Sequence, residues 1–439
     1  MAQPHTTQRP SSTNLVDLLS SYNSPVQKSL LACLQPGEVA TLNMTSTKFF
    51  DMDRTLATSL YNINLKLKKF FDNPQGFRSL QGECNAIVVS DFALKFLSRD
   101  TLPDGLVIYA PQANAPKLKH WLEDQGYTMA KPNEGNDEDE DNDNDDDEDA
   151  EPGDLWWKNV AGKKLTVSLD VLTVPPIQKL LNHASTTANL NFITWNAAYS
   201  LFPSSTFITK DAYMLNAMED TTRGNRVAQE VALLAACGIK TSSSRHQGLT
   251  SAMSAFRRIG DKYTWKLPLC TKDISLSSIP VQVLESTTFK LHHMEVGYLP
   301  VSALQQHYKI SASCISSQVL EYDYVVSKEV EENNGLLQGY SNYMCKIQRL
   351  QRHLSDAVHI ELMKIPRKDR PRSSRFPHPD FGGIQMVVVE DADFVLPSTW
   401  IYRDDEMFPY LKDAWEAELD EKGVVVSESE AEVIYAHEN

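Results

Sequence analysis

Two short apolar segments, each followed by a helical pattern, constrain the fold of this chain more than any other feature. Residues 86–89 form an apolar run, and Ser90 stands where it can cap a helix over the next residues. Residues 106–110 form a second run, and residues 115–125 place leucine and tryptophan at helical spacing before a glycine. This order predicts an α/β (α+β) fold, with a small mixed sheet flanked by helices.

The length of the chain predicts more than one hydrophobic core. A single core stops growing near about 250–300 residues, and this chain has 439. We predict a disordered lead-in over residues 1–14, a helical region over 15–71, an α/β core over 72–206 and an α+β region over 207–439. Within the core, residues 134–151 hold 13 of the 58 acidic side chains and no Lys or Arg. Such a segment repels itself and buries nothing, which predicts a solvated, disordered insertion.

Hydrophobic periodicity predicts further elements along the chain. Alternation predicts a strand over residues 164–173, and a helix follows from Pro175 or Pro176. Helical patterns cover residues 56–71, 192–198, 227–237, 340–363 and 407–419, and an apolar strand is predicted at 384–389.

The excess negative charge of the chain is concentrated in the acidic insertion. The formal net charge is -16, but without the acidic insertion 45 acidic side chains face 42 basic ones. Residues 364–375 contain six basic side chains, broken by prolines and without interleaved aromatic residues. Because aromatic platforms and a wider basic face are missing, we predict a solvated loop, or one paired with the acidic insertion, and no nucleic-acid binding.

The remaining composition argues against a membrane protein and against a metalloprotein. The longest apolar run, residues 231–237, is far too short to cross a bilayer, and the first residues lack the apolar core of a secretory signal. The six cysteines contain no CxxC pair and do not cluster with histidine. We therefore predict an intracellular protein without metal or cofactor, in either the cytoplasm or the nucleus.

The strand, turn, helix and strand over residues 85–110 resemble the opening of the nucleotidyltransferase fold, in the divergent form of a group of uncharacterised fungal proteins. In that family a Gly-Ser pair after the first strand grips the triphosphate. Two acidic residues on the next strand, and a third on a later strand, hold divalent metal. The resemblance extends over residues 182–193 and 201–203 and more faintly over 257–265, so that the region over which these segments are spread is about half of the chain.

The residues at the motif positions differ from those of the family. Ser90 and Asp91 stand at the Gly-Ser position, and a carboxylate about 4 Å from a phosphate repels it by roughly 4 kcal/mol at an effective dielectric near 20. Gly105 and Val107 stand where the two metal-binding acids would be, and neither side chain offers an oxygen ligand. The resemblance therefore implies a degenerate phosphate loop and no metal site.

Two acidic residues remain close to the motif. Asp170 fits the place of the third carboxylate, and Asp104 lies one residue before the first lost position. If the chain is active, these two are the candidate catalytic residues. The plainer interpretation is that Asp170 is an outward residue of an alternating strand and Asp104 a turn residue. His183 and Ser185 are a further acid/base and hydroxyl pair without an identifiable third partner.

The N-terminal helical pattern carries a second resemblance. Its apolar positions are Leu30, Leu31, Leu34, Pro36, Val39 and Leu42. With residues 45–50 they resemble the second half of an F-box, the helical module that docks substrate receptors onto cullin-RING ubiquitin ligases. In the first half, Gln27 and Lys28 stand where the family has apolar residues. The resemblance implies that the six apolar positions contact a ubiquitin-ligase adaptor, and the alternative is a helical hairpin covering the sheet.

The sequence as a whole predicts a non-catalytic protein-interaction protein on a degenerate nucleotidyltransferase-like fold. Its expected partners are proteins, with a ubiquitin-ligase adaptor as the specific candidate. The alternative is a residual transferase that depends on a divalent metal.

Overall fold

The structure is a computed structural model that describes residues 19, 24–45, 50–130, 153–215, 221–242, 256–296, 305–328, 341–371 and 394–421. The predicted lead-in, the acidic insertion and the predicted strand at 384–389 lie outside the described residues. So do residues 372–375 of the basic loop. Within the described ranges the chain is a mixed α/β protein built on an eight-stranded mixed sheet.

The main sheet has the strand order β11-β7-β6-β1-β2-β5-β4-β3. Its strands are β1 (Ile87–Val89), β2 (Gly105–Pro111), β3 (Thr128–Met129), β4 (Asp154–Val160), β5 (Lys163–Leu172), β6 (Asn191–Ile193), β7 (Ala197–Ser200) and β11 (Trp265–Pro268). Neighbouring strands are antiparallel except β2 and β5, which are parallel. The predicted α/β class is confirmed, but the sheet is larger than the small one predicted.

Part of this difference comes from residues 191–200, where the predicted helix is wrong. The segment forms the antiparallel strands β6 and β7, and every residue of both strands is buried. A segment that is buried on both faces shows no alternation. Its periodicity therefore does not distinguish a strand from a buried helix.

The helices follow the predicted positions more closely. They are α2 (Ser24–Cys33), α3 (Pro36–Thr45), α4 (Phe50–Thr58), α5 (Ile63–Leu67), α6 (Pro74–Glu83), α7 (Ser90–Ser98), α8 (Ala115–Asp124), α9 (Pro176–His183), α10 (Thr221–Ala236), α12 (Val281–Glu285), α13 (Asn342–Lys364) and α14 (Asp404–Glu421). The single helix predicted over 56–71 is wrong. It divides because Asn62 caps α5, accepting a hydrogen bond from the Leu65 backbone N–H.

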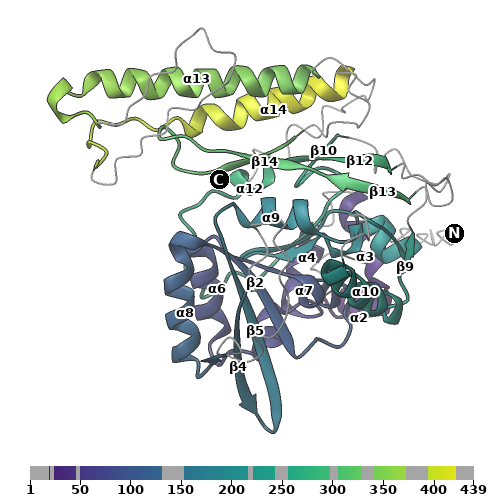
Figure 1. The fold of residues 1–439 in the computed structure, drawn as a ribbon. Helices are drawn as coiled ribbons and strands as arrows, with labels where there is room; N and C mark the ends of the chain where they lie inside the picture. Colours follow the sequence, from purple (N-terminus) through teal and green to yellow (C-terminus); the bar gives the residue numbers. More distant parts are fainter. Residues whose placement is uncertain are drawn as a thin grey trace, which may run out of the picture.

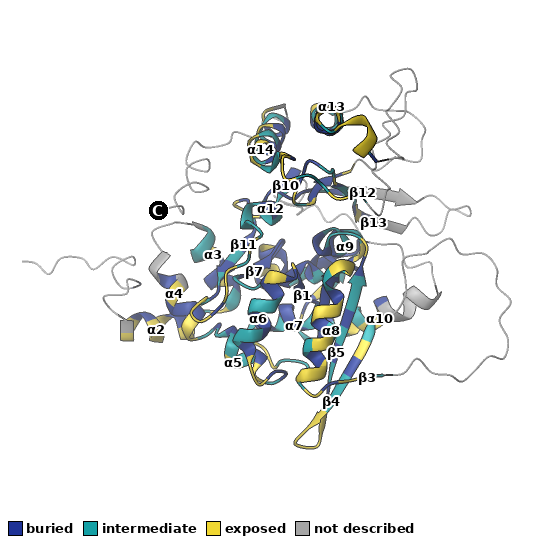
Figure 2. Cartoon of the chain, turned by 90° about the vertical axis from the view of Figure 1, so that its left-hand side faces the viewer, coloured by how far each residue is buried: buried dark blue, intermediate teal, exposed yellow. Residues whose placement is uncertain are grey.

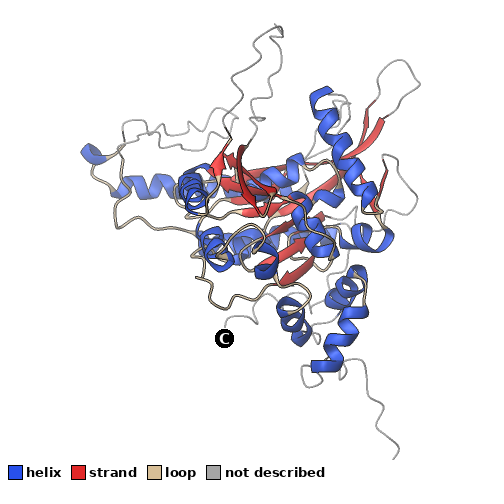
Figure 3. Cartoon of the chain, turned by 90° about the horizontal axis from the view of Figure 1, so that it is seen from below, coloured by secondary structure: helices blue, strands red, loops and turns tan. Residues whose placement is uncertain are grey.

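One face of the main sheet is covered by the N-terminal helices. Figure 3 shows the strands between helices on both sides. A single apolar core joins α2–α8 to this face and contains, for example, Leu31, Tyr61, Phe92 and Trp265. The helical region predicted over 15–71 therefore shares its core with the sheet and is not an independent module.

The other face of the sheet packs against α9 and a second strand layer. This layer contains β10 (Phe256–Arg258), β12 (Thr288–Val296), β13 (Gln305–Ile310), β14 (Ala312–Ile315) and β15 (Tyr324–Ser327). A further pair, β8 (Asp211–Tyr213) and β9 (Lys240–Ser242), is parallel. Helices α13 and α14 lie side by side over the second layer, at the top of Figure 1, and form a third core with it.

The predicted boundary at residue 206 does not separate the layers. Strand β11, from the region predicted as C-terminal, pairs with β7 at the edge of the main sheet. Buried Arg257 in β10 is held by Asp261 at 2.5 Å and also donates to the carbonyl of Leu201. Interlayer contacts of this kind make the layers one packed body. No helix in the described part of the chain is long and apolar enough to cross a membrane.

Candidate functional site

Ser90 and Asp91 lie directly after strand β1, at the start of α7. Ser90 has a φ of 65°, a conformation that glycine adopts more readily than serine. Asp91 lies in the first turn of α7, where burial raises the pKa of its carboxyl and the charge of Lys95 acts in the opposite direction. The turn thus combines a glycine-like backbone conformation at Ser90 with a partly buried carboxyl at Asp91.

Asp104 precedes β2 at the same end of the sheet as Ser90, since Val89 pairs with Val107. Its carboxylate lies 2.6 Å from the Lys69 ammonium, and it is more than half exposed. The hydrogen bond and charge of Lys69 lower its pKa. Lys69 also donates to the carbonyl of Pro103, so the lysine fastens this turn to the helices. Asp104 acts as a surface ion-pair partner in this arrangement.

Asp170 lies near the other end of the sheet. In the parallel pair β2 and β5, Gly105 is level with Thr166, whereas Asp170 is level with Tyr109. Asp104 and Asp170 are thus five register positions apart, about 16 Å along the strands. The side chain of Asp170 accepts a hydrogen bond from Ser168 at 2.9 Å. These two candidate acids do not meet at one site.

The register also shows what surrounds the positions at which the resemblance would place metal-binding acids. Gly105 and Val107 on β2 stand beside Thr166 and Ser168 on β5. Two hydroxyls, a glycine and a valine form a poor site for a divalent cation, which prefers carboxylate oxygens. No group of three or more His, Cys, Asp or Glu side chains in the described ranges is arranged to hold a metal ion.

The F-box-like positions divide between the core and the surface. Leu31 and Val39 are completely buried in the core of this chain, so they are not accessible to an adaptor. Leu34, Pro36 and Leu42 are half-buried. Leu30 is 37% exposed. Arg99 at the end of α7 donates to the carbonyls of Leu31 and Leu34, which fixes α2 against the core.

The outer side of α2 carries exposed apolar side chains. Val26 and Leu30 are exposed and four residues apart, so they share one face of the helix. The exposed residues of α2 are visible in Figure 2. Gln27 is buried and bonds to Thr55 and to the carbonyl of Leu19, which explains a polar residue at this position.

His183 and Ser185 do not form a common site either. His183 ends α9 and is exposed, whereas Ser185 is buried and its carbonyl accepts from the Leu215 backbone N–H.

Cys314 lies in β14, where burial, and then the charge and hydrogen bond of Asp323, raise the pKa of its thiol to about 12. A thiol with this pKa is protonated at neutral pH and is a poor nucleophile.

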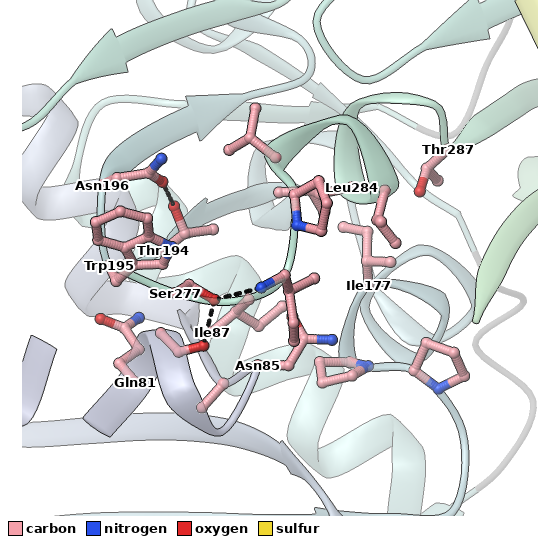
Figure 4. A pocket seen from close by; sticks show the side chains of 18 of the residues that line it. Gln81, Asn85, Ile87, Ile177, Thr194, Trp195, Asn196, Ser277, Leu284 and Thr287 are labelled. Atoms are coloured by element: carbon pink, nitrogen blue, oxygen red, sulfur yellow. Dashed lines mark hydrogen bonds between the residues drawn. The ribbon is translucent and has the colours of Figure 1, made fainter. Parts of the chain in front are cut away.

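A cavity that the sequence did not predict lies at the opposite end of β1 from Ser90. It measures about 60 Å³ and lies where the main sheet meets the second layer. Its walls come from five separate parts of the chain: the α6–β1 turn, the start of α9, the β6–β7 turn, residues 277–287, and Asp323 with Val325 at β15. Figure 4 shows Trp195, Ile87, Ile177 and Leu284 around it. No local motif marks the cavity, because no two of its walls are neighbours in sequence.

Buried Arg78 on α6 fixes one wall of this cavity. Its guanidinium donates to the carbonyl of Trp195 at 2.9 Å, to Asn64 at 2.9 Å and to the carbonyl of Cys270 at 2.8 Å. All three acceptors are neutral. Burial lowers the pKa of Arg78 to about 10, which leaves the side chain protonated at neutral pH. The arginine thereby ties α6 to two loops that are far away in the sequence.

Hydrogen bonds of Ser277 stabilise the neighbouring wall of the cavity. The Ser277 hydroxyl donates to the carbonyl of Gly82 at 2.7 Å and accepts from the backbone N–H of Ile279 at 3.1 Å. Figure 4 shows both hydrogen bonds in the middle of the view. Since Gly82 also lies against the Trp195 ring, these residues hold the two walls in one arrangement.

Comparisons with known proteins identify no relative. No protein-family model matches this chain, and neither a curated protein nor a solved structure is significantly similar to it. The nucleotidyltransferase-like and F-box-like resemblances therefore stay predictions.

Proposed function

We propose that this chain is a non-catalytic protein-interaction protein built on an α/β scaffold. The observation that carries the proposal is the position of the two candidate acids. Asp104 is paired with Lys69, and Asp170 lies about 16 Å further along the sheet. A two-metal or one-metal transferase needs its acids around one reacting phosphate.

The charge at the β1–α7 turn supports the same proposal. Asp91 stands where the family holds the triphosphate, and its nearest basic neighbour on the helix is Lys95. A nucleotide at this turn would bring phosphate charges next to a half-buried carboxylate. Repulsion of this kind opposes binding by several kcal/mol at an effective dielectric near 20.

Calorimetry with magnesium and ATP tests the non-catalytic part. We expect no saturable heat with the full chain. The positions that the resemblance assigns to phosphate and metal binding carry Asp91, Gly105 and Val107 instead of the family's residues. Saturable binding that is lost in both Asp104→Asn and Asp170→Asn would instead support the residual transferase.

The surface that we propose for a protein partner is the outer side of α2. Val26 and Leu30 are the large apolar side chains that are exposed among the described residues of this helix, and they belong to the F-box-like segment. A ubiquitin-ligase adaptor is the partner that the resemblance implies. Contact through Leu31 or Val39 would require the helices to leave the core, at a cost of about 2–5 kcal/mol for each large apolar side chain.

The purified adaptor provides the direct test. Val26→Asp and Leu30→Asp should abolish its binding without lowering the unfolding midpoint, because both side chains face outward. Leu65→Asp is the matched control, since Leu65 is exposed on α5 outside the proposed surface. An adaptor that never binds the wild-type chain, or that binds both α2 variants normally, would remove the adaptor from the proposal.

A further inference from the structure

The cavity at the start of β1 has the features of a ligand site, independently of the proposed function. Its walls are mostly apolar and include the rings of Pro175, Pro176, Pro280 and Trp195. Proline rings are rigid and remove backbone donors. The hydrogen bonds of Arg78 and Ser277 hold the surrounding loops in place. A cavity with walls of this kind is preformed, which lowers the entropy lost on binding.

The size of the cavity limits what can enter. A cavity of 150 Å³ lined by apolar side chains holds benzene, whereas this one measures about 60 Å³. A branched group of about three carbon atoms fits such a space, but an aromatic ring or a nucleobase does not. The structure therefore points to a compact aliphatic group.

The charge of the cavity limits the ligand further. Among the described lining residues there is no Lys, Arg or His, and the one acid is Asp323, beside Cys314. An anion would enter an apolar space without a counter-charge, which is strongly unfavourable. The ligand should therefore be uncharged.

One buried hydroxyl in the wall lacks a partner. Thr287 is 1% exposed, and its Oγ1 has no hydrogen-bond partner among the described residues. Buried hydroxyls are normally hydrogen-bonded. In Figure 4 the hydroxyl points to the side on which Leu284 and Ile177 lie. The Thr287 backbone is fixed, since its N–H donates to Leu284 and its carbonyl accepts from Ile259.

We propose that this cavity binds a small uncharged aliphatic molecule, whose branched end fills the apolar space and whose carbonyl or hydroxyl forms a hydrogen bond with Thr287. Both parts of the assignment follow from the walls: the space accepts about three carbon atoms, and the orphan hydroxyl gives the polar group its partner. Because Thr287 Oγ1 has less than 1 Å² of accessible surface, this hydrogen bond requires rotation of the side chain about its Cα–Cβ bond.

Methyl NMR spectra of the full chain test the proposal, with Ile, Leu and Val methyl groups labelled. The probe is isobutyramide, which joins an isopropyl group to an uncharged amide. We expect saturable shifts at Ile87, Ile177 and Leu284, whereas Ile360, exposed on α13, should not shift. Isobutyrate has the same shape with a negative charge, and benzamide has the same amide with a ring. Neither should produce saturable shifts.

Variants separate a real site from weak surface binding. Thr287→Val should weaken isobutyramide binding by roughly two- to tenfold, as loss of one net hydrogen bond does, and Thr287→Ser should retain it. Ala86→Leu should fill the cavity, and Ile279→Trp, at a half-buried wall position, should block it if the first variant does not fold. The proposal is wrong if shifts do not saturate, if isobutyrate or benzamide shifts the same methyls saturably, if Thr287→Val binds normally, or if a folded blocking variant still binds.

Discussion

The two ends of strand β1 lie three residues apart, yet they differ in kind. The end at Ser90 has a spacing that resembles a family motif, but Asp91 is half-buried and Asp104 is paired with Lys69. The end at Ile87 resembles no motif, but five parts of the chain line a cavity there. The comparison teaches that motif spacing is a local property, whereas a usable site depends on which distant segments are brought together.

The interactions that stabilise the two ends of β1 should differ in how much stability is lost when they are removed. The cavity end depends on a fully buried arginine with neutral acceptors, whereas the Ser90 end depends on exposed or half-buried charges. Buried polar ties cost much more to break than exposed ion pairs. Five predictions, ordered from the largest expected effect to the smallest, test this contrast.

Removal of the Arg78 guanidinium should have the largest effect. Arg78→Met leaves the carbonyls of Trp195 and Cys270 and the side chain of Asn64 without their donor. We expect the free energy of unfolding to fall by about 3–5 kcal/mol, measured by urea denaturation with circular dichroism. The exposed Arg352→Met on α13 should change it by less than about 0.5 kcal/mol. Equal effects of the two variants would contradict the role given to Arg78.

A methyl group at Gly82 should disturb the cavity walls. Its Cβ would lie 3.0 Å from Trp195 Cγ and 3.3 Å from Ser277 Cβ. Overpacking costs about 1–3 kcal/mol, and the better helix propensity of alanine offsets about 1 kcal/mol of this, which leaves a net loss near 1 kcal/mol. Tryptophan fluorescence should also change, because the ring must move.

Gly105→Ala is the matched change near the Ser90 end. Its Cβ would meet Thr166 Oγ1 at 3.0 Å, an atom that side-chain rotation can move away. We expect a smaller loss than for Gly82→Ala and an unchanged fluorescence spectrum. If Gly105→Ala is the more damaging of the two, the cavity walls are not the more tightly packed region.

Replacement of Ser90 by glycine should stabilise the protein. The φ of 65° strains serine by about 1–2 kcal/mol, and the greater flexibility of glycine in the unfolded chain cancels part of the gain. We expect a net increase of about 0.5–1 kcal/mol in the free energy of unfolding. Ser98→Gly, in the last turn of the same helix, should instead lower it. A loss of stability in Ser90→Gly would show that the serine side chain holds this turn.

The carboxylates at the Ser90 end should produce small effects of opposite sign. The folded pKa of Asp91 is raised by burial, so its ionisation destabilises the fold as the pH rises through that pKa. The folded pKa of Asp104 is lowered by Lys69, so its contribution is present above the ordinary carboxyl pKa and lost as the pH falls through the lowered one. At pH 7, Asp91→Asn should therefore raise the unfolding midpoint and Asp104→Asn should lower it. At pH 3 both differences should shrink, and shifts of the same sign at pH 7 would contradict the assigned environments.

Local structure near β1 could be predicted from the sequence because short-range patterns specify it. The apolar run at 86–89, the helix from Ser90 and the strand at 106–110 appear within a residue or two of their predicted positions. Alternation likewise located β5, and apolar spacing located α13 and α14. These signals depend on neighbours within a few residues, which the sequence contains directly.

Only the tertiary structure determined the register of the strands and which distant side chains lie together. The sequence resemblance predicted Asp170 to lie near Gly105 and Val107, but the pairing of β2 with β5 puts Ser168 beside Val107 instead. Leu31 and Val39 have the pattern of a docking surface, but the sheet beneath them makes them core. The cavity required Arg78, Trp195 and Ser277 to meet across nearly 200 residues of chain. Long-range contacts of this kind are fixed by the packing of whole layers, so the sequence determined which elements form, and only the fold determined which of their side chains share a site.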